Sequence, residues 1–116
     1  MTSKPIPYEF VLDLLHPLEI RVKSMFGVQV LYVNEKLCLG LRKRERVPED
    51  NGLMIRCETD AVAEQLAKEV PSLRAMQSIP SKKWLLIPTE ADDFEELAEW
   101  VCGLIRRGDQ RIGVLG

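Results

Sequence analysis

The residues of this 116-residue chain that could do chemistry begin with a short basic run, interrupted by a single glutamate: Arg42, Lys43, Arg44 and Arg46. Displayed on one edge of a domain, four cations neutralise several phosphates, so the run predicts a local nucleic-acid site. The alternative is a solvated loop, because acidic residues follow at 49 and 50 and no aromatic side chain is interleaved for stacking. Four more cations would extend the patch if the fold brings them near: Lys82, Lys83, Arg106 and Arg107.

Two tryptophans are candidates for a partner-binding surface. Aromatic side chains dominate the energetics of interfaces, and Trp84 and Trp100 supply the largest ones in the chain. Packing in the core is the alternative for both. Trp84 begins an expected strand, and Trp100 borders the apolar side of an expected helix.

Residues for catalysis or metal binding are sparse. His16 is the only histidine, and Cys38, Cys57 and Cys102 form no closely spaced pair of the kind that zinc sites use. The chain contains no GxSxG, P-loop, HExxH or GxGxxG pattern. We expect no catalytic constellation, no cofactor and no metal. Cys38 and Cys57 fit buried strand positions, whereas Cys102 falls off the apolar side of its helix and is expected to be exposed.

Composition and charge limit the class of protein. Hydrophobic residues make up 46% and charged residues 29%, which excludes a disordered or fibrous chain. The net charge of −2 means that any attraction to polyanions is local. Charged residues interrupt every apolar stretch before membrane-spanning length, and the first residues lack the apolar run of a signal peptide. With an odd number of cysteines, these features predict one cytoplasmic domain with no membrane contact.

The first half of the chain predicts a helix followed by strands. Apolar residues recur at helical spacing up to about Leu15, where Pro17 ends the helix. Alternation over residues 19–25 predicts a strand with one solvated face. Residues 28–33 and 36–41 predict a hairpin with Leu37, Leu39 and Leu41 on one face. Residues 42–52 predict a protruding loop before a strand over 53–57, in a register that places Cys38 opposite Cys57.

The second half predicts two helices and two further strands. Asp60 is the expected N-cap of a helix that Pro71 closes, and residues 73–76 and 83–87 are expected strands. Thr89 is the expected cap of a last helix that ends at Gly108. The order predicts an α+β domain over residues 1–116. It has two layers, a mainly antiparallel sheet of about five to six strands, and helices at the N-terminus, middle and C-terminus.

Residues 1–6 and 109–116 are expected to be flexible tails. The C-terminal tail is apolar for a terminus, so docking on its own domain and addition to a sheet edge of another molecule are alternatives to fraying.

Several segments resemble the N-terminal domain of the TfoX (Sxy) family. They are Met25-Phe26-Gly27 with Leu31-Tyr32 in the following strand, the strand 53–57 leading into a helix, and the strand 84–87 before an acidic-capped helix. The resemblance implies an antiparallel sheet with packed helices, a regulatory role and no catalytic residue. The second, helical domain of the competence regulators in this family has no counterpart in these 116 residues, so competence regulation is not carried over.

Together these features predict a non-enzymatic regulatory or protein-interaction module. We expect a protein partner or self-association into a homodimer. One alternative is a nucleic-acid-binding module that uses Arg42, Lys43, Arg44 and Arg46. Another is a small ligand-binding protein or enzyme with a pocket near Trp84 or Trp100.

Overall fold

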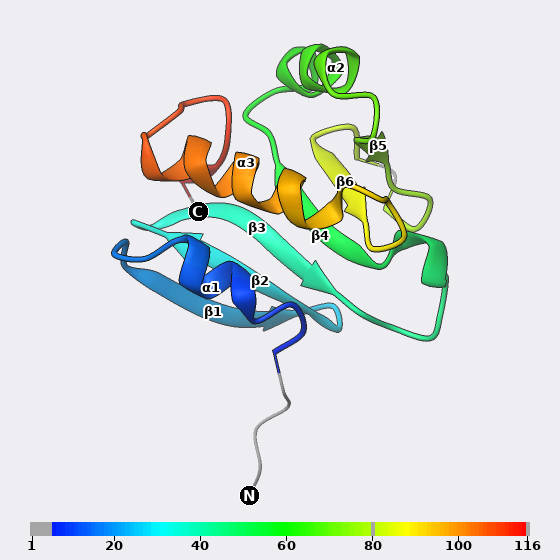
Figure 1. Ribbon diagram of the computed structural model, residues 1–116, viewed down its shortest axis with the longest axis horizontal. Coiled ribbons are helices and arrows are strands. Elements are labelled where there is room, and N and C mark those ends of the chain that lie inside the picture. The colour runs from blue at the N-terminus through cyan, green and yellow to red at the C-terminus, as the bar shows by residue number, and fades with distance from the viewer. Residues whose placement is uncertain (1–5, 80, 116) are drawn as a thin grey trace, which may run out of the picture.

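The structure is a computed structural model that describes residues 6–79 and 81–115 (Figure 1). Within these ranges the helices are α1 (Phe10–Leu14), α2 (Asp60–Glu69) and α3 (Phe94–Arg106), with one 3-10 turn, η1 (Pro48–Asp50). The strands are β1 (Ile20–Met25), β2 (Val28–Val33), β3 (Lys36–Arg42), β4 (Gly52–Arg56), β5 (Arg74–Ala75), β6 (Trp84–Pro88) and β7 (Val114–Leu115). No helix in the described part of the chain is long and apolar enough to cross a membrane.

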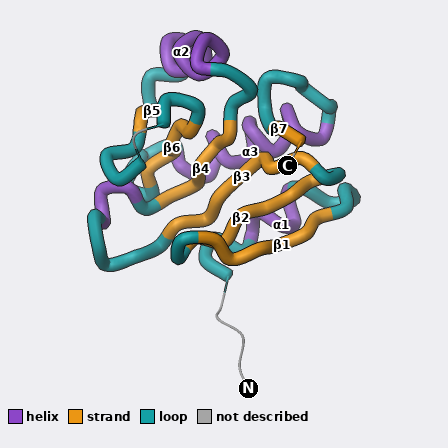
Figure 2. The backbone as a smooth tube through the Cα atoms, turned by 180° about the vertical axis from the view of Figure 1, so that it is seen from behind, coloured by secondary structure: helices purple, strands orange, loops and turns teal. Residues whose placement is uncertain are grey.

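The strands form one antiparallel sheet in the order β1-β2-β3-β4-β6-β5, and β7 pairs with β3. Helices α1 and α3 pack against one face, and in Figure 2 the strands lie in front of both helices. The main core between these layers includes Leu39, Ile55 and Val101, each fully buried. The predicted α+β class is confirmed. The prediction was about five to six strands, and the described residues form seven, of which β7 was not predicted.

The register between β3 and β4 differs from the prediction by one residue. Leu39 pairs with Ile55 and Leu41 with Leu53, which leaves Cys57 in a bridge with Ile112 instead of opposite Cys38. Residues opposite each other in an antiparallel pair share a face. The predicted register was wrong because it would have paired inward-facing Leu39 with Arg56 on the other face.

Leu37 lies on the opposite face of the sheet from the one predicted, because β3 contains a β-bulge. Leu31 pairs with Leu39, but Tyr32 pairs with Leu37, so Cys38 is an extra residue in β3. Leu37 therefore packs in a second, smaller cluster on the other face of the sheet, away from Leu39.

Both predicted helix caps are wrong. Thr59, rather than Asp60, caps α2 by accepting a hydrogen bond from the Val62 N–H at 3.1 Å. Helix α3 begins after Asp93, and the Thr89 hydroxyl instead lies 2.9 Å from the Tyr8 hydroxyl. The C-terminal stop is confirmed, since Gly108 follows the helix with φ +74°.

The C-terminal tail docks on its own domain, one of the alternatives that the sequence left open. Arg111 accepts from the Glu58 N–H at 2.9 Å, Gly113 donates to Arg56 at 2.8 Å, and β7 then pairs with the start of β3. Residues 112–115 therefore join the sheet, through the Ile112 bridge and β7, and do not form the flexible tail that was predicted. Ile6, which was also predicted to lie in a flexible tail, is partly buried against the main core. Residues 1–5 and 116 of the two predicted tails lie outside the described residues.

Candidate functional site

The segment 42–51, called the basic loop from here on, is organised around a buried arginine. Arg42 is 4% exposed, and its guanidinium donates to the carbonyl oxygens of Val47 at 2.9 Å and Arg46 at 2.7 Å. It also donates to the side-chain oxygen of Asn51 at 2.9 Å. These charge-assisted hydrogen bonds join the start of the loop to its middle and its end. The conformation of the loop is therefore stabilised by hydrogen bonds from a buried side chain.

Asn51 and Tyr8 complete this support. The Asn51 amide accepts from the Arg44 N–H and donates to the Arg44 carbonyl, both at 2.8 Å. The Tyr8 hydroxyl donates to the Arg42 carbonyl at 3.0 Å. The backbone on both sides of Lys43 is thus fixed, while the Lys43, Arg44 and Arg46 side chains are exposed.

The β1–β2 turn lies against the basic loop. Phe26 and Gly27 have φ +53° and +74°, and Arg44 Nη1 donates to the Phe26 carbonyl at 3.2 Å. A Cβ atom on Gly27 would lie 2.9 Å from Arg44 Cζ, so the guanidinium packs directly on the turn. The Phe26 side chain itself is 89% exposed. It projects into solvent on a backbone conformation that disfavours bulky residues.

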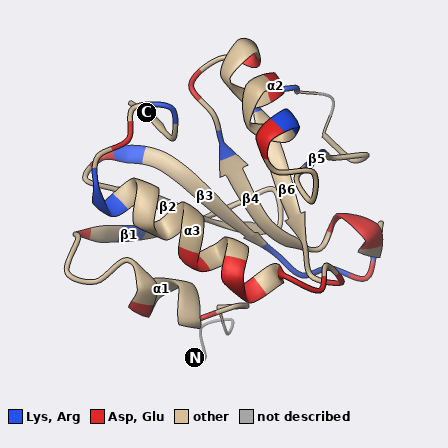
Figure 3. Ribbon diagram, turned by 45° about the horizontal axis from the view of Figure 1, so that its top comes forward, with Lys and Arg blue, Asp and Glu red and all other residues tan. Residues whose placement is uncertain are grey.

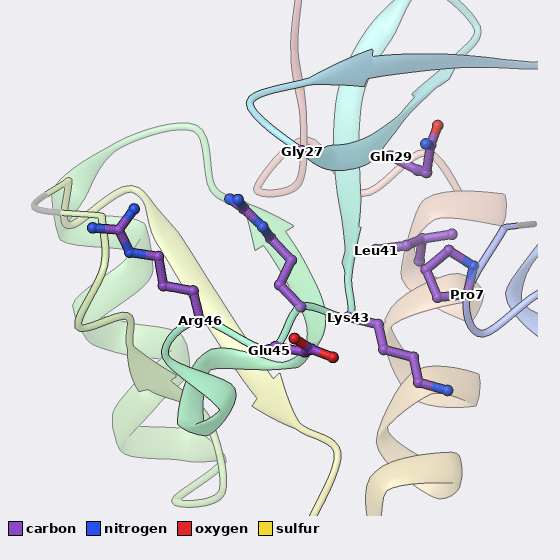
Figure 4. Close-up of a pocket in the computed structure, with 8 residues that line it drawn as sticks. Pro7, Gly27, Gln29, Leu41, Lys43, Glu45 and Arg46 are labelled. Atoms are coloured by element: carbon purple, nitrogen blue, oxygen red, sulfur yellow. The ribbon is translucent and has the colours of Figure 1, made fainter. Parts of the chain in front are cut away.

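Three hollows have Arg44 in their lining. One of them, of about 680 Å³, lies beside Tyr8 and Asn51. The other two lie between the basic loop and the β1–β2 turn. The first of these two has a volume of about 440 Å³ and is lined by Pro7, Gln29 and Glu45 as well as the basic residues of the loop (Figure 4). Figure 4 shows Lys43 and Arg46 pointing to opposite sides of the loop. The second hollow, of about 380 Å³, joins Phe26 to Arg44, Arg46 and an apolar floor made by Val28, Val47 and Ile79.

Asp50 fixes the other side of the loop. Its carboxylate is fully buried and accepts from the Gln77 N–H, the Ser78 N–H and hydroxyl, and Arg74 Nη1 at 2.6–3.2 Å. Burial alone would raise the pKa of this carboxyl, but the donors from Ser78, Gln77 and Arg74 outweigh burial and lower the pKa to about 2. Asp50 therefore stays ionised and ties η1 to the segment before β6.

The structure separates the predicted basic residues into two kinds. Arg42 is not available to a phosphate, because it is buried and its guanidinium donates to three acceptors inside the loop. Lys43, Arg44 and Arg46 remain at the surface, where the sequence placed them. The proposed extension of the patch is wrong. The pairing of β3, β4 and β6 places four cations at the opposite end of the sheet: Lys82, Lys83, Arg106 and Arg107.

Local charge agrees with this separation. Figure 3 shows a basic stretch directly after β3, with acidic residues on η1 beyond it and on the first turns of α3. Within the second hollow, the described lining includes Arg44 and Arg46 and no acidic residue. Of these two hollows, only the first has Glu45 in its lining.

The tryptophans share no surface. Trp84 is half-buried in the smaller cluster, with the Arg56 guanidinium 5.9 Å from its ring centroid. Trp100 is half-buried against the main core on the other face of the sheet. Both tryptophans pack against the apolar clusters, as the alternative of core packing predicted. They lie on opposite faces of the sheet, so the structure does not bring them together as a partner site.

The other candidate chemical groups are also separated. His16 is exposed, while all three cysteines are free and buried. Burial raises the pKa of Cys57 to about 11 and that of Cys102 to about 12. The expectation of an exposed Cys102 was wrong because α3 also buries residues on the side next to its main apolar stripe. No group of three His, Cys, Asp or Glu residues within the described ranges could hold a metal ion.

Sequence reasoning missed Phe26, Asp50 and Asn51 as parts of this region. Phe26-Gly27 between two strands carries a turn signal, but nothing local indicates that the loop 18 residues later packs on it. Buried aspartate and arginine residues are rare, and their partners here depend on tertiary structure.

Comparison with protein-family models, curated proteins and solved structures gives no match for this chain. The resemblance to the TfoX N-terminal domain therefore stays a prediction.

Proposed function

We propose that the protein is a non-enzymatic binding module that holds a negatively charged partner at the basic loop. The observation that carries this proposal is the internal support of the loop by Arg42, whose donors reach three points of the segment. A loop that only connects two strands needs no such support. A binding site benefits from it, because a loop with a fixed backbone loses little conformational freedom when a partner binds.

Backbone strain in the same region supports the proposal. Among the residues that the structure describes, five non-glycine residues have positive φ, and three of them, Tyr8, Phe26 and Val47, border the hollows around the loop. Val47 is β-branched and has φ +49°, a conformation that such residues rarely adopt. Strain of this kind persists where the surroundings enforce it and is concentrated at functional sites.

The proposed module acts in the cytoplasm, in a regulatory role set by what it binds. Three free cysteines support a reducing compartment. The absence of catalysis is part of the proposal. It is supported by the exposure of His16 and by the burial that raises the pKa of Cys102.

Binding of anionic probes tests the proposal. The probes are a fluorescein-labelled 20-nucleotide single-stranded DNA, the matching duplex, and a labelled polyglutamate peptide, each titrated at low salt. The double variant Lys43→Glu/Arg46→Glu spares Arg42 and Arg44, which have structural contacts. The control, Lys68→Glu/Arg107→Glu, makes the same change in net charge on exposed residues elsewhere.

We expect at least one probe to bind the native protein, with affinity at least tenfold lower in the loop variant and little changed in the control. Equal loss in both variants would mean that only overall charge matters. That result, or no binding of any probe, would overturn the proposal.

A further inference from the structure

We infer that the partner held at the basic loop is a single-stranded nucleic acid, with one base stacked on Phe26 and the neighbouring phosphates on Lys43, Arg44 and Arg46. This inference rests on the proposed function and names its ligand. The juxtaposition that carries it is an 89%-exposed aromatic ring beside the cations of a loop with a fixed backbone, brought together from two segments by the fold.

Phe26 supplies the stacking group that the basic run lacks in the sequence. Stacking on aromatic rings beside a cationic track is the common way in which proteins bind single strands. The ring needs no movement to become available, since it is already in solvent. Its backbone is held by Arg44, so the aromatic group and the cation keep a fixed relation.

The second hollow is suited to a base. Its volume of about 380 Å³ lies in the range of small-ligand pockets, and its floor combines Val28, Val47 and Ile79. Arg44 and Arg46 line the same hollow, so a phosphate next to the inserted base meets a guanidinium.

A single strand fits these features better than a duplex or an acidic peptide does. In a duplex the bases are stacked on each other, so Phe26 reaches none of them without unstacking. An acidic peptide satisfies the cations but leaves the ring and the apolar hollow without a matching flat group. The local carboxylate, Glu45, lines the first hollow rather than the second, so phosphate binding beside Phe26 meets no described acidic side chain in that hollow.

The experiment compares the three probes named above with Phe26 variants at matched salt. Phe26→Tyr keeps a stacking ring, Phe26→Leu keeps apolar bulk only, and Phe26→Asn places a residue that tolerates positive φ in the turn. Leu115→Asn is the matched control, because within residues 6–79 and 81–115 Leu115 is the other strongly exposed apolar side chain, at 78%, and pairs with Lys36 at the far end of β3.

We expect the native protein to bind the single strand at least tenfold more tightly than the duplex or the peptide. Phe26→Leu and Phe26→Asn should each weaken single-strand binding about tenfold, while Phe26→Tyr and Leu115→Asn leave it within about twofold. With three cations in contact, log K should fall by about 2 for each tenfold rise in salt.

Two results would overturn this inference while leaving the proposed function intact. One is binding of the peptide or the duplex as tight as that of the single strand, with the loop charges still required. The other is single-strand binding that is indifferent to Phe26→Leu and Phe26→Asn, both shown by circular dichroism to be folded. Failure of the loop-charge test itself would overturn the proposed function and the inference together.

Discussion

The two ends of strand β3 are built by different means. At the Lys36 end, β7 pairs with the strand, and the turn between β2 and β3 holds Asn34 at φ +50° and Glu35 at φ +70°, of which the asparagine tolerates this conformation. At the Arg42 end, the chain buries a guanidinium and, nearby, a carboxylate, Asp50. It also holds bulky residues at positive φ.

The difference shows that a connection between strands does not require the arrangement at the Arg42 end. Buried charges are costly unless every donor and acceptor is matched, and a strained turn persists only where its surroundings enforce it. Among the described residues no buried side-chain nitrogen or oxygen lacks a hydrogen-bond partner, and the residues that Arg42 and Asp50 fix include the exposed Lys43, Arg44 and Arg46. We take this as the mark of a surface that must keep its shape.

Removal of Asp50 should have the largest effect. Asp50→Ala leaves Arg74 and the Ser78 and Gln77 donors without their acceptor and should lower the free energy of unfolding by about 3 kcal/mol. Urea denaturation measures this. Asp109→Ala, which breaks the partly exposed Asp109–Arg111 pair at the other end, should cost about 1 kcal/mol or less. Equal losses at the two sites would remove the contrast between the two ends.

Acid should destabilise the protein through the same carboxylate. The pKa of Asp50 is about 2 in the fold and about 3.9 when unfolded, so its contribution is present above pH 4 and is lost as the pH falls toward 2. This amounts to about 2.5 kcal/mol. Asp50→Asn should flatten this part of the stability-against-pH curve, measured by urea denaturation between pH 2 and 5. An unchanged slope would contradict the assignment.

Loss of the Arg42 side-chain hydrogen bonds should lower the free energy of unfolding by about 2 kcal/mol. Arg42→Met fills a similar volume but leaves the Arg46 and Val47 carbonyls without their donors. Hydrogen exchange should show faster exchange at residues 44–51, with the β2–β3 pairing protected as before. Uniform acceleration over the whole sheet would mean that Arg42 supports the entire fold rather than the loop.

Exchange of residues between the two turns should give effects of opposite sign. Phe26→Asn relieves an unfavourable conformation and should raise the free energy of unfolding by about 1 kcal/mol, whereas Asn34→Phe should lower it by a similar amount. Thermal unfolding of the two variants measures both. If Phe26→Asn were destabilising, Phe26 would have to be a structural residue in spite of its exposure.

The smallest change is expected in thiol reactivity. All three cysteines are buried, and the pKa of Cys102 is raised to about 12, so a thiol reagent at pH 8 should modify none of them in the fold. All three should react in denaturant. Rapid modification in the folded protein would mean that the core opens at the Lys36 end, where Cys38 lies beneath Gly113.

Local patterns predicted most of the fold. The hairpin, the strand over 53–57 and the long α3 follow from periodicity, and Gly108 marks a helix end by its own chemistry. The predicted register of β3 and β4 was wrong because it paired residues that lie on opposite faces of the sheet. The predicted face of Leu37 was wrong because of a β-bulge, which no local sequence pattern indicates. Such features are set by tertiary packing.

The candidate site was predicted only in part. The basic run identifies the right segment, but composition cannot show that Arg42 turns inward while its neighbours turn outward. The partners of Asp50 lie 24 to 28 residues away in the chain, and Phe26 lies 18 residues before the arginine that contacts it. Contacts of this kind carry no pattern in one sequence.

We propose that buried Arg42 holds the basic loop in the shape that binds a partner. Single-strand binding by Arg42→Met tests it most directly, with Lys68→Met as the control that removes one surface charge. Both are titrated by fluorescence anisotropy where circular dichroism shows them folded. We predict at least tenfold weaker binding for Arg42→Met and less than threefold for Lys68→Met, although Lys43, Arg44 and Arg46 are intact in both. Equal affinities would contradict the claim and leave the loop as a set of surface charges.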